Sequence, residues 1–187
     1  MYIHILRKKI ESVCRKALYD YDLVDSAPVG VALSGGKDSI TLLLMLRAIS
    51  GRGMPAFPLH AFHVGGEFSC GAGVEEAYLR GICEALGVEL TVLESKQKLE
   101  TLACYRCSRE RRSLIFAAAR ERGIERVAFG HHRDDSNQTL LLNLLHKGEF
   151  AANLAKVPMH DYGVTIIRPL ILAEEDDIRT FAKLQGF

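Results

Sequence analysis

Apolar residues recur along the chain with two different spacings. From Ile3 to about Tyr19 they return every three or four residues, which predicts a helix. Beyond residue 26, short apolar runs alternate with longer helical stretches, several of which end at a glycine. The short runs predict five strands, at residues 29–33, 58–64, 88–93, 126–129 and 164–167, and the longer stretches predict helices at 40–49, 75–86, 108–122, 135–146 and 174–184.

This alternation of strands and helices is typical of βαβ units, and it predicts an α/β fold with a five-stranded parallel sheet and helices on both faces. We expect an N-terminal helical segment over residues 1–26, followed by a single α/β domain over residues 27–187. Parallel sheets bind ligands at the carboxyl ends of their strands. Candidate functional residues are therefore sought in the loops 34–39, 65–73, 95–107 and 130–135.

Composition narrows the class of protein. Hydrophobic residues make up 48% and charged residues 25%, as in an ordinary globular protein. The longest aliphatic run, near residues 40–46, is much shorter than the roughly 20 residues of a membrane span, and the N-terminus lacks the order of a signal peptide. We therefore expect a cytoplasmic protein. The net charge of +1 is low for a nucleic-acid binder, so RNA binding would need a local basic patch or a second subunit.

The segment Ser34-Gly-Gly-Lys-Asp-Ser39 lies between the first predicted strand and the next helix. Gly35 and Gly36 allow a sharp turn close to a ligand, and the amides at a helix N-terminus bind anions. Ser34 and Ser39 add hydroxyl donors, Lys37 adds a positive charge, and Asp38 would hold a Mg²⁺ ion that bridges phosphate oxygens. An ordinary glycine turn is the alternative, but the strand–loop–helix position favours a phosphate loop. The spacing does not match a P-loop of the Walker A type, because Gly36 occupies its lysine position.

A second polar segment, Gly130-His-His-Arg-Asp-Asp135, follows the fourth predicted strand and so lies at the same edge of the sheet. His131 and His132 are suited to contact a phosphate or a base. Asp134 and Asp135 are suited to bind Mg²⁺ or orient a substrate, although one of them is expected to cap the following helix. Titratable groups clustered at a strand end favour a functional site.

The third segment contains Cys104 and Cys107 in a Cys-x-x-Cys spacing, which can bind a metal or exchange thiols. Arg106, Arg109, Arg111 and Arg112 surround the pair. Positive charge lowers the pKa of a thiol and favours the reactive thiolate. Five cysteines cannot all pair, and in a cytosolic chain this spacing favours metal or redox chemistry over a disulfide. Two buried cysteines that only pack are the alternative.

Together these segments resemble the PP-loop ATP pyrophosphatases, and within them the tRNA 2-thiocytidine synthetase group. The matching stretches are the phosphate loop, Cys104-x-x-Cys-Ser-Arg-x-Arg-Arg, Gly130-His-His-Arg-Asp-Asp, Gln138-Thr-Leu and Ile167-Arg-Pro-Leu170. The resemblance implies a three-layer, Rossmann-like fold of the adenine nucleotide alpha hydrolase type. Lysidine synthetases share the phosphate loop and a Gly-His-His-x-Asp-Asp motif but not the Cys-x-x-Cys, so thiolation is favoured.

The resemblance also implies a mechanism. ATP would adenylate the 2-oxo group of a cytidine in tRNA, and sulfur from sulfide or a donor protein would then displace AMP. It implies catalytic roles for Cys104, Cys107, Asp38, Asp134 and Arg111, and nucleotide contacts from residues 34–39, Gly130, His131 and Asp135. The backbone of His63 and Val64 would contact adenine. The family holds a [4Fe-4S] cluster through three cysteines, of which Cys104 and Cys107 match two, and Cys70 is a candidate for the third. A homodimer would help to assemble an RNA-binding surface.

Three alternatives remain open from the sequence. One is a different adenylating PP-loop enzyme, either similar to lysidine synthetase or acting on a small molecule, which the near-neutral charge and the short C-terminus would suit. Another is a protein that retains ATP binding without chemistry, which the absence of the family's downstream third cysteine would suit. A zinc-stabilised module built on Cys104 and Cys107 is the third, but it needs two further ligands.

Overall fold

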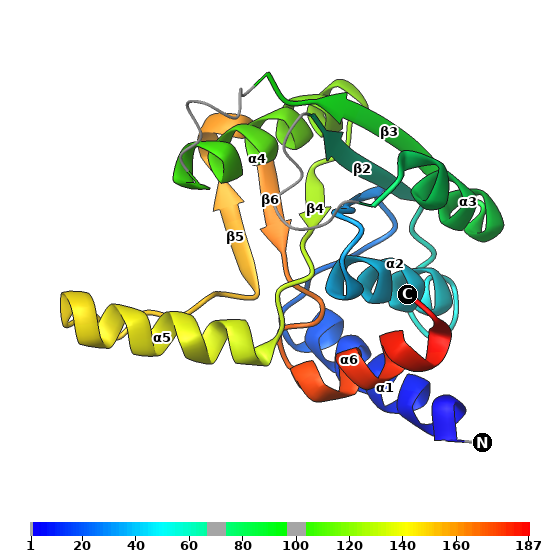
Figure 1. Cartoon of the computed structure of the whole chain (residues 1–187), viewed down its shortest axis with the longest axis horizontal. Coiled ribbons are helices and arrows are strands. Elements are labelled where there is room, and N and C mark those ends of the chain that lie inside the picture. Colours follow the sequence, from blue (N-terminus) through cyan, green and yellow to red (C-terminus); the bar gives the residue numbers. More distant parts are fainter. Residues whose placement is uncertain (1, 67–73, 97–103) are drawn as a thin grey trace.

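The computed structural model describes residues 2–66, 74–96 and 104–187 (Figure 1). The helices are α1 (Tyr2–Asp20), α2 (Lys37–Ile49), α3 (Glu76–Leu86), α4 (Cys104–Glu121), α5 (Arg133–Lys147) and α6 (Glu175–Gln185), with a short 3₁₀ turn at His160–Tyr162. The strands are β1 (Val29–Ala32), β2 (Leu59–Gly65), β3 (Glu89–Glu94), β4 (Arg126–Ala128), β5 (Lys156–Met159) and β6 (Val164–Ile167).

The strands form one sheet in the order β3-β2-β1-β4-β6-β5. All neighbouring pairs are parallel except β5 and β6, which are antiparallel. The α/β fold with a parallel sheet is therefore confirmed, but the prediction of five strands missed β5. Pro158 interrupts the apolar pattern of this strand, and proline is tolerated there because β5 lies at the edge of the sheet.

The order of the strands places a crevice beside β1. Val31 pairs with Ala61 of β2 on one side and with Ala128 of β4 on the other. The chain thus leaves β1 toward β2, and later returns to the opposite side of β1 through β4. Because β1 and β4 are parallel neighbours, the loops that follow them lie at the same edge of the sheet, beside this switch in strand order, which is where ligands bind in open α/β sheets.

Apolar side chains cover both faces of the sheet. On one face, Val29 and Val31 pack in a cluster with α1, α2, α3 and α6, and on the other, Phe62, Val64 and Val127 pack with α4. Helices therefore flank both faces, as predicted. Helix α1 contributes Ile10 and Leu18, both fully buried, to the first cluster, so the N-terminal segment shares the core of the rest of the chain.

Two helices begin three or more residues earlier than predicted, and both lead to the crevice. Helix α2 begins at Lys37 rather than residue 40, because Gly36 adopts the extended conformation of an N-cap. Helix α4 begins at Cys104 rather than residue 108, so the Cys-x-x-Cys segment forms its first turn. Across the described residues, every helix is too short or too polar to cross a bilayer.

Candidate active site

The phosphate loop depends on the conformation of Gly35. Its φ of +90° is one that residues with a side chain rarely adopt, and an added Cβ would lie 2.8 Å from Cγ2 of Val74. Gly36, in contrast, has an ordinary φ of −76° and caps α2 without a side-chain hydrogen bond. The loop therefore turns at Gly35 and delivers the chain directly into the first turn of α2.

Two serine hydroxyls brace this turn. Ser39 Oγ accepts a hydrogen bond from the Gly35 amide at 3.2 Å and donates to the Gly36 carbonyl at 2.9 Å. Ser34 Oγ lies 3.1 Å from Ser39 Oγ and accepts from the Gly36 amide at 3.3 Å. The first amides of α2 have no partner four residues earlier, since this is so at any helix N-terminus. Together with the helix dipole, these amides can bind an anion.

Lys37 links the phosphate loop to α6. Its ammonium lies 3.0 Å from the Asp38 carboxylate and 3.1 Å from that of Glu175. Burial is the largest single influence and acts to lower the pKa of Lys37, but the two carboxylates together outweigh it and raise the pKa. Lys37 is therefore a cation at neutral pH, placed at the start of α2.

The loop after β4 approaches the phosphate loop very closely at Gly130. A Cβ at this position would lie 3.0 Å from the backbone carbon of Asp38 and 3.1 Å from the Ser39 amide nitrogen. These are backbone atoms in the first turn of a helix, so they cannot move aside as a flexible side chain could. Gly130 is thus required for contact between the two loops, beyond the nucleotide contact that the sequence predicted for it.

Helix α5 begins immediately after this contact with a reciprocal cap. The His132 amide donates to Asp135 Oδ2 at 2.9 Å, and the Asp135 amide donates to Nδ1 of the buried His132 at 3.4 Å. Asp134 Oδ2 accepts from the amide of Glu175 at 2.9 Å and so caps α6. Both carboxylates therefore have structural partners. They differ in position, because Asp135 lines the cavity beside the phosphate loop and Asp134 does not.

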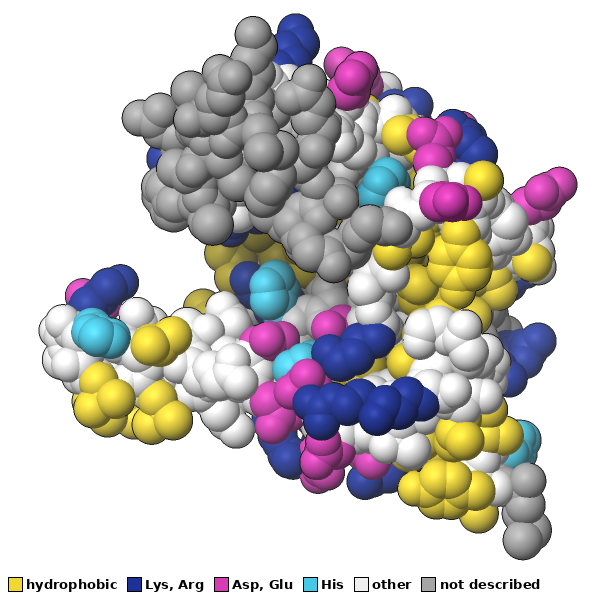
Figure 2. Space-filling model, in the orientation of Figure 1, with side chains coloured by type: hydrophobic (Ala, Val, Ile, Leu, Met, Phe, Trp, Pro, Cys, Tyr) yellow, Lys and Arg dark blue, Asp and Glu magenta, His cyan; other side chains and the backbone are white. Residues whose placement is uncertain are grey.

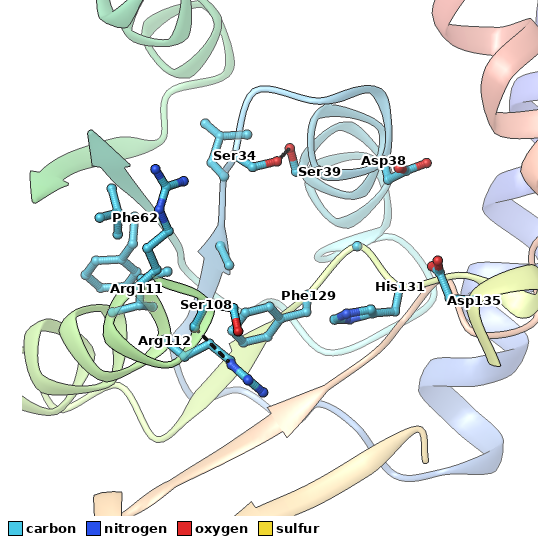
Figure 3. Close-up of a pocket in the computed structure, with 15 residues that line it drawn as sticks. Ser34, Asp38, Ser39, Phe62, Ser108, Arg111, Arg112, Phe129, His131 and Asp135 are labelled. Atoms are coloured by element: carbon cyan, nitrogen blue, oxygen red, sulfur yellow. Dashed lines mark hydrogen bonds between the residues drawn. The ribbon is translucent and has the colours of Figure 1, made fainter. Parts of the chain in front are cut away.

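A cavity of about 530 Å³ opens beside these loops, between the start of α2 and the start of α4 (Figure 3). Ser34, Asp38 and Ser39 line one side, and Gly130, His131 and Asp135 line the next. Its remaining lining residues come from β1, β2, α4 and the end of β4: Ala32, Leu33, Phe62, Val64, Ser108, Arg111, Arg112, Ile115 and Phe129. The cavity thus joins an anion-binding loop to a cationic helix across an apolar floor.

His131 is held as a neutral ring within this site. Burial lowers its pKa, and the nearby cations of Arg168 and Arg112 lower it further. Arg168 Nε donates to His131 Nδ1 at 3.4 Å, while another nitrogen of the same guanidinium donates to the Leu154 carbonyl at 2.5 Å. Because Nδ1 accepts this bond, the proton of the neutral ring resides on Nε2, which leaves His131 as a donor.

His63 and Val64, the two site residues predicted from β2, have different surroundings. Val64 lines the cavity, and the adenine contact predicted for its backbone stays a prediction. His63 is buried, and its Nδ1 lies 2.8 Å from the carbonyl oxygen of Leu33, the residue that follows β1. Its side chain is therefore engaged with the protein backbone, and the adenine contact predicted for the His63 backbone stays a prediction.

The cysteines are described only in part. Cys107 is buried in the first turn of α4, one residue before Ser108 of the cavity wall. Cys104 begins the same helix, but its side chain lies outside the described residues, as does the whole of Cys70. Within the part of the chain that the structure describes, no three histidine, cysteine or acidic side chains are grouped as metal ligands. The iron–sulfur and Mg²⁺ assignments stay predictions.

Several cavity residues were not assigned a site role from the sequence. Ser108, Arg112 and Ile115 recur with Arg111 at helical spacing, and all four lie within the helix predicted over residues 108–122, so this spacing could have placed them on one face. Phe62 shares a strand face with Val64 by simple alternation. Arg168 carries no local signal, because its contact with His131 joins residues 37 positions apart.

Fold and site together define an α/β protein in which a Ser-Gly-Gly-Lys-Asp-Ser loop, suited to bind an anion, opens the first crossover helix. Residues 4–187 match the family model described as the PP-loop domain, and the chain belongs to this family.

Within the family, the chain is similar to tRNA-cytidine(32) 2-sulfurtransferases. It is 38% identical to that of Dechloromonas aromatica, covering 97% of this chain and 66% of the relative, and 35% identical to that of Syntrophotalea carbinolica, covering 97% and 72%. Among solved structures it resembles the U34-tRNA thiolase NcsA from Methanococcus maripaludis with its [4Fe-4S] cluster, with a TM-score of 0.75, 26% identity, and coverage of 98% of this chain and 64% of that one. The chain thus spans about two thirds of the length of these relatives.

Proposed function

We propose that this chain catalyses the ATP-dependent thiolation of a cytidine in tRNA. The observation that supports this most strongly is the shared cavity: the phosphate loop lines one side, and the helix that begins with Cys-x-x-Cys lines the other. An adenylated oxygen bound at the loop would then lie across the cavity from the helix that bears the cysteines. The names of the relatives, which are tRNA 2-sulfurtransferases, support the same reaction.

In the first step, the cytidine O2 attacks the α-phosphate of ATP, the α–β bond breaks, and pyrophosphate leaves. Lys37 and the first amides of α2 would stabilise the charge that grows on the leaving pyrophosphate. Asp38 lines the cavity, and Mg²⁺ needs only one or two carboxylates when phosphates complete its shell, so Asp38 suits the predicted ion. Val64 and the backbone of His63 would hold adenine, and Gly130, His131 and Asp135 would hold the phosphates or the activated base.

In the second step, sulfur attacks C2 of the cytidine, the C2–O bond breaks, and AMP leaves with the oxygen. Arg111 lines the α4 side of the cavity and would neutralise the phosphate of the departing AMP. Asp134 would orient the substrate. Cys104, Cys107 and Cys70 are the residues assigned to a [4Fe-4S] cluster, which would present the sulfur to be transferred. The predicted partners are tRNA, sulfide or a sulfur-donor protein, and a second copy of the chain.

The reaction products test this proposal. Purified protein, reconstituted with iron and sulfide under anaerobic conditions, should release AMP and pyrophosphate from ATP only when tRNA is present. Mass spectrometry of the tRNA nucleosides should then detect 2-thiocytidine. Release of ADP, or of AMP without any dependence on tRNA, would contradict the proposal.

A pair of glycine variants ties this activity to the site. Gly130→Ala should lower the rate about 100-fold, because the added methyl group would push the two loops apart, and small misplacements near a reacting centre cost that much. Gly81→Ala is the matched control: it lies in α3, and its Cβ would meet nothing within 4 Å. Equal activity of the two variants would show that contact between the loops is not needed.

A further inference from the structure

A second cavity, of about 330 Å³, lies at the opposite end of α2 from the phosphate loop. Three arginines line it: Arg7 of α1, Arg47 in the last turn of α2, and Arg52 in the loop that follows. The rest of its wall is largely apolar, with Leu44 and Met45 of α2, Leu86 of α3 and Phe181 of α6. We call this cavity the arginine groove. No aspartate or glutamate is among its described lining residues.

The positive charges of the arginine groove are not balanced within the described part of the chain. Arg7, Arg47 and Arg52 are exposed and form no ion pair there. Over α6, by contrast, lysine and arginine side chains lie among acidic ones (Figure 2), and Arg179 is 2.9 Å from the Glu175 carboxylate. Three guanidinium groups around one cavity repel one another, so an anion bound between them would lower the electrostatic energy.

The helix ends at the groove account for only one of the three arginines. Arg47 Nε donates to the Leu86 carbonyl at 2.8 Å and so satisfies the last turn of α3, a usual role for a cation at a helix C-terminus. Arg7 lies in the second turn of α1, where a cation gains nothing from the helix dipole, and Arg52 lies beyond the end of α2. Among the described residues, neither of these two side chains has a hydrogen-bonding partner. Both are therefore available to a ligand.

We propose that the arginine groove binds phosphate groups of the RNA substrate outside the active-site cavity. Guanidinium groups bind phosphate oxygens through parallel pairs of hydrogen bonds, and arginine is the residue preferred for nucleic-acid recognition. A net charge of +1 gives the molecule as a whole little attraction for RNA, so contacts to the RNA backbone are expected where unpaired cations gather. This inference rests on the proposed function, since it takes RNA to be the substrate.

The position of the groove suits an RNA that also reaches the active site. Lys37 begins α2 at the phosphate loop, and Arg47 follows in the last turn of the same helix, about 15 Å further along its axis. A nucleic-acid strand advances about 3.4 Å per nucleotide, so phosphates in the groove would lie on the order of five nucleotides from the reacting base. Phosphate contacts fix the orientation of a nucleic acid without reading its sequence. The groove would therefore position the RNA, and the choice of nucleotide would be made in the cavity.

The salt dependence of RNA binding tests the groove. The double variant Arg7→Gln/Arg52→Gln removes the two side chains without partners, and its fold can be checked by circular dichroism. Each lost phosphate contact lowers the slope of log affinity against log salt concentration by about 0.7 to 0.9. Titrations of unfractionated tRNA should therefore give a slope smaller by about 1.5, and binding about 30-fold weaker at 0.1 M salt.

A matched control separates the groove from net charge. Lys16→Gln/Arg80→Gln changes the net charge by the same amount, but it removes exposed cations that already pair with Asp20 and Glu76. It should therefore retain nearly the affinity and slope of the wild type. An equal loss of affinity in both double variants would overturn the assignment, because it would show a response to net charge alone.

Two further results would also overturn it. Equal slopes for the wild type and the groove variant would show that the groove makes no phosphate contact with RNA. Weaker ATP binding by the groove variant, with tRNA binding unchanged, would assign the groove to a free nucleotide. Binding is measured without ATP turnover or a sulfur source. Normal tRNA binding without thiolation would therefore contradict the proposed function alone, and normal thiolation with an unchanged slope in the groove variant would contradict the groove alone.

Discussion

His131 is the residue whose chemistry depends most on its surroundings. Its burial and the cations of Arg168 and Arg112 hold its pKa below the ordinary value of 6.5. In the unfolded chain the imidazole binds a proton as the pH falls through about 6.5, whereas in the folded protein it stays neutral to a lower pH. Stability rises with pH wherever the unfolded state binds more protons. His131 therefore makes the protein less stable as the pH falls below about 6.5.

Urea unfolding at pH 7.5 and pH 5.5 measures this effect. The wild-type protein should lose more free energy of unfolding between these pH values than His131→Asn, which cannot take up the proton. His60, whose pKa is also lowered chiefly by burial, remains in both proteins and contributes equally. Arg112→Gln should raise the pKa of His131 in a histidine NMR titration, since it removes one of the cations. An identical pH dependence in wild type and His131→Asn would contradict this account.

The chemistry of single residues was predictable where neighbours in sequence create it. Gly35, Lys37 and Asp38 form one turn, and their suitability for phosphate could be predicted from their order alone. The neutral state of His131 could not, because it depends on burial in the folded protein and on Arg168, the residue that follows β6. Nor could the contact of Gly130 with α2, which arises only when β4 is inserted beside β1.

At the scale of elements, Asp134 connects two helices at the site. It lies in the first turn of α5, yet its carboxylate accepts the Glu175 amide at the start of α6. Glu175 in turn pairs with Lys37 at the start of α2. The N-termini of α2, α5 and α6 are thus joined beside the cavity. Asp134 supplies the bond between α5 and α6.

Asp134→Ala should lower the free energy of unfolding by about 1 kcal/mol, the usual effect of a lost cap at a helix N-terminus. Asp134→Asn keeps a side-chain oxygen that can accept the same bond, so it should lose much less. Urea unfolding of the two variants measures the difference. The Asn variant also tests the proposed catalytic role, because a loss of activity at unchanged stability would support it. Equal stability of Asp134→Ala and wild type would rule out the cap.

Most elements could be predicted from the sequence because the residues that a helix or strand buries recur with the period of that element. Helix α2 and strand β1, both largely buried, were found within three residues of their ends. Strand β5 was missed because it lies at the sheet edge, where neither face is fully buried and Pro158 breaks the pattern. The early start of α4 was missed because its first turn is polar apart from the cysteines, so no apolar period marks it.

For the whole molecule, the arrangement of α1 and α6 explains how the ends of the chain support the site. Helices α1, α2 and α6 share one core cluster, and Glu175 at the start of α6 pairs with Lys37 of the phosphate loop. Ligand binding at the loop should therefore stabilise the core as far as α1. Cys14 of α1 is fully buried, and burial raises its pKa to about 12, so its thiol can react only when the core opens.

ATP should then protect Cys14 from alkylation. A ligand present at 100 times its dissociation constant stabilises the folded state by about 2.7 kcal/mol, which corresponds to about 100-fold slower modification when opening is in rapid equilibrium. Peptide mapping after iodoacetamide treatment measures the rates for Cys14 and for Cys83, a buried cysteine of α3, in the same sample. Similar rates would mean that α1 opens together with the α/β domain, whereas a faster Cys14 would mark residues 1–26 as a separate unit. Gly130→Ala should lose most of the protection, and full protection in that variant would place the nucleotide away from the phosphate loop.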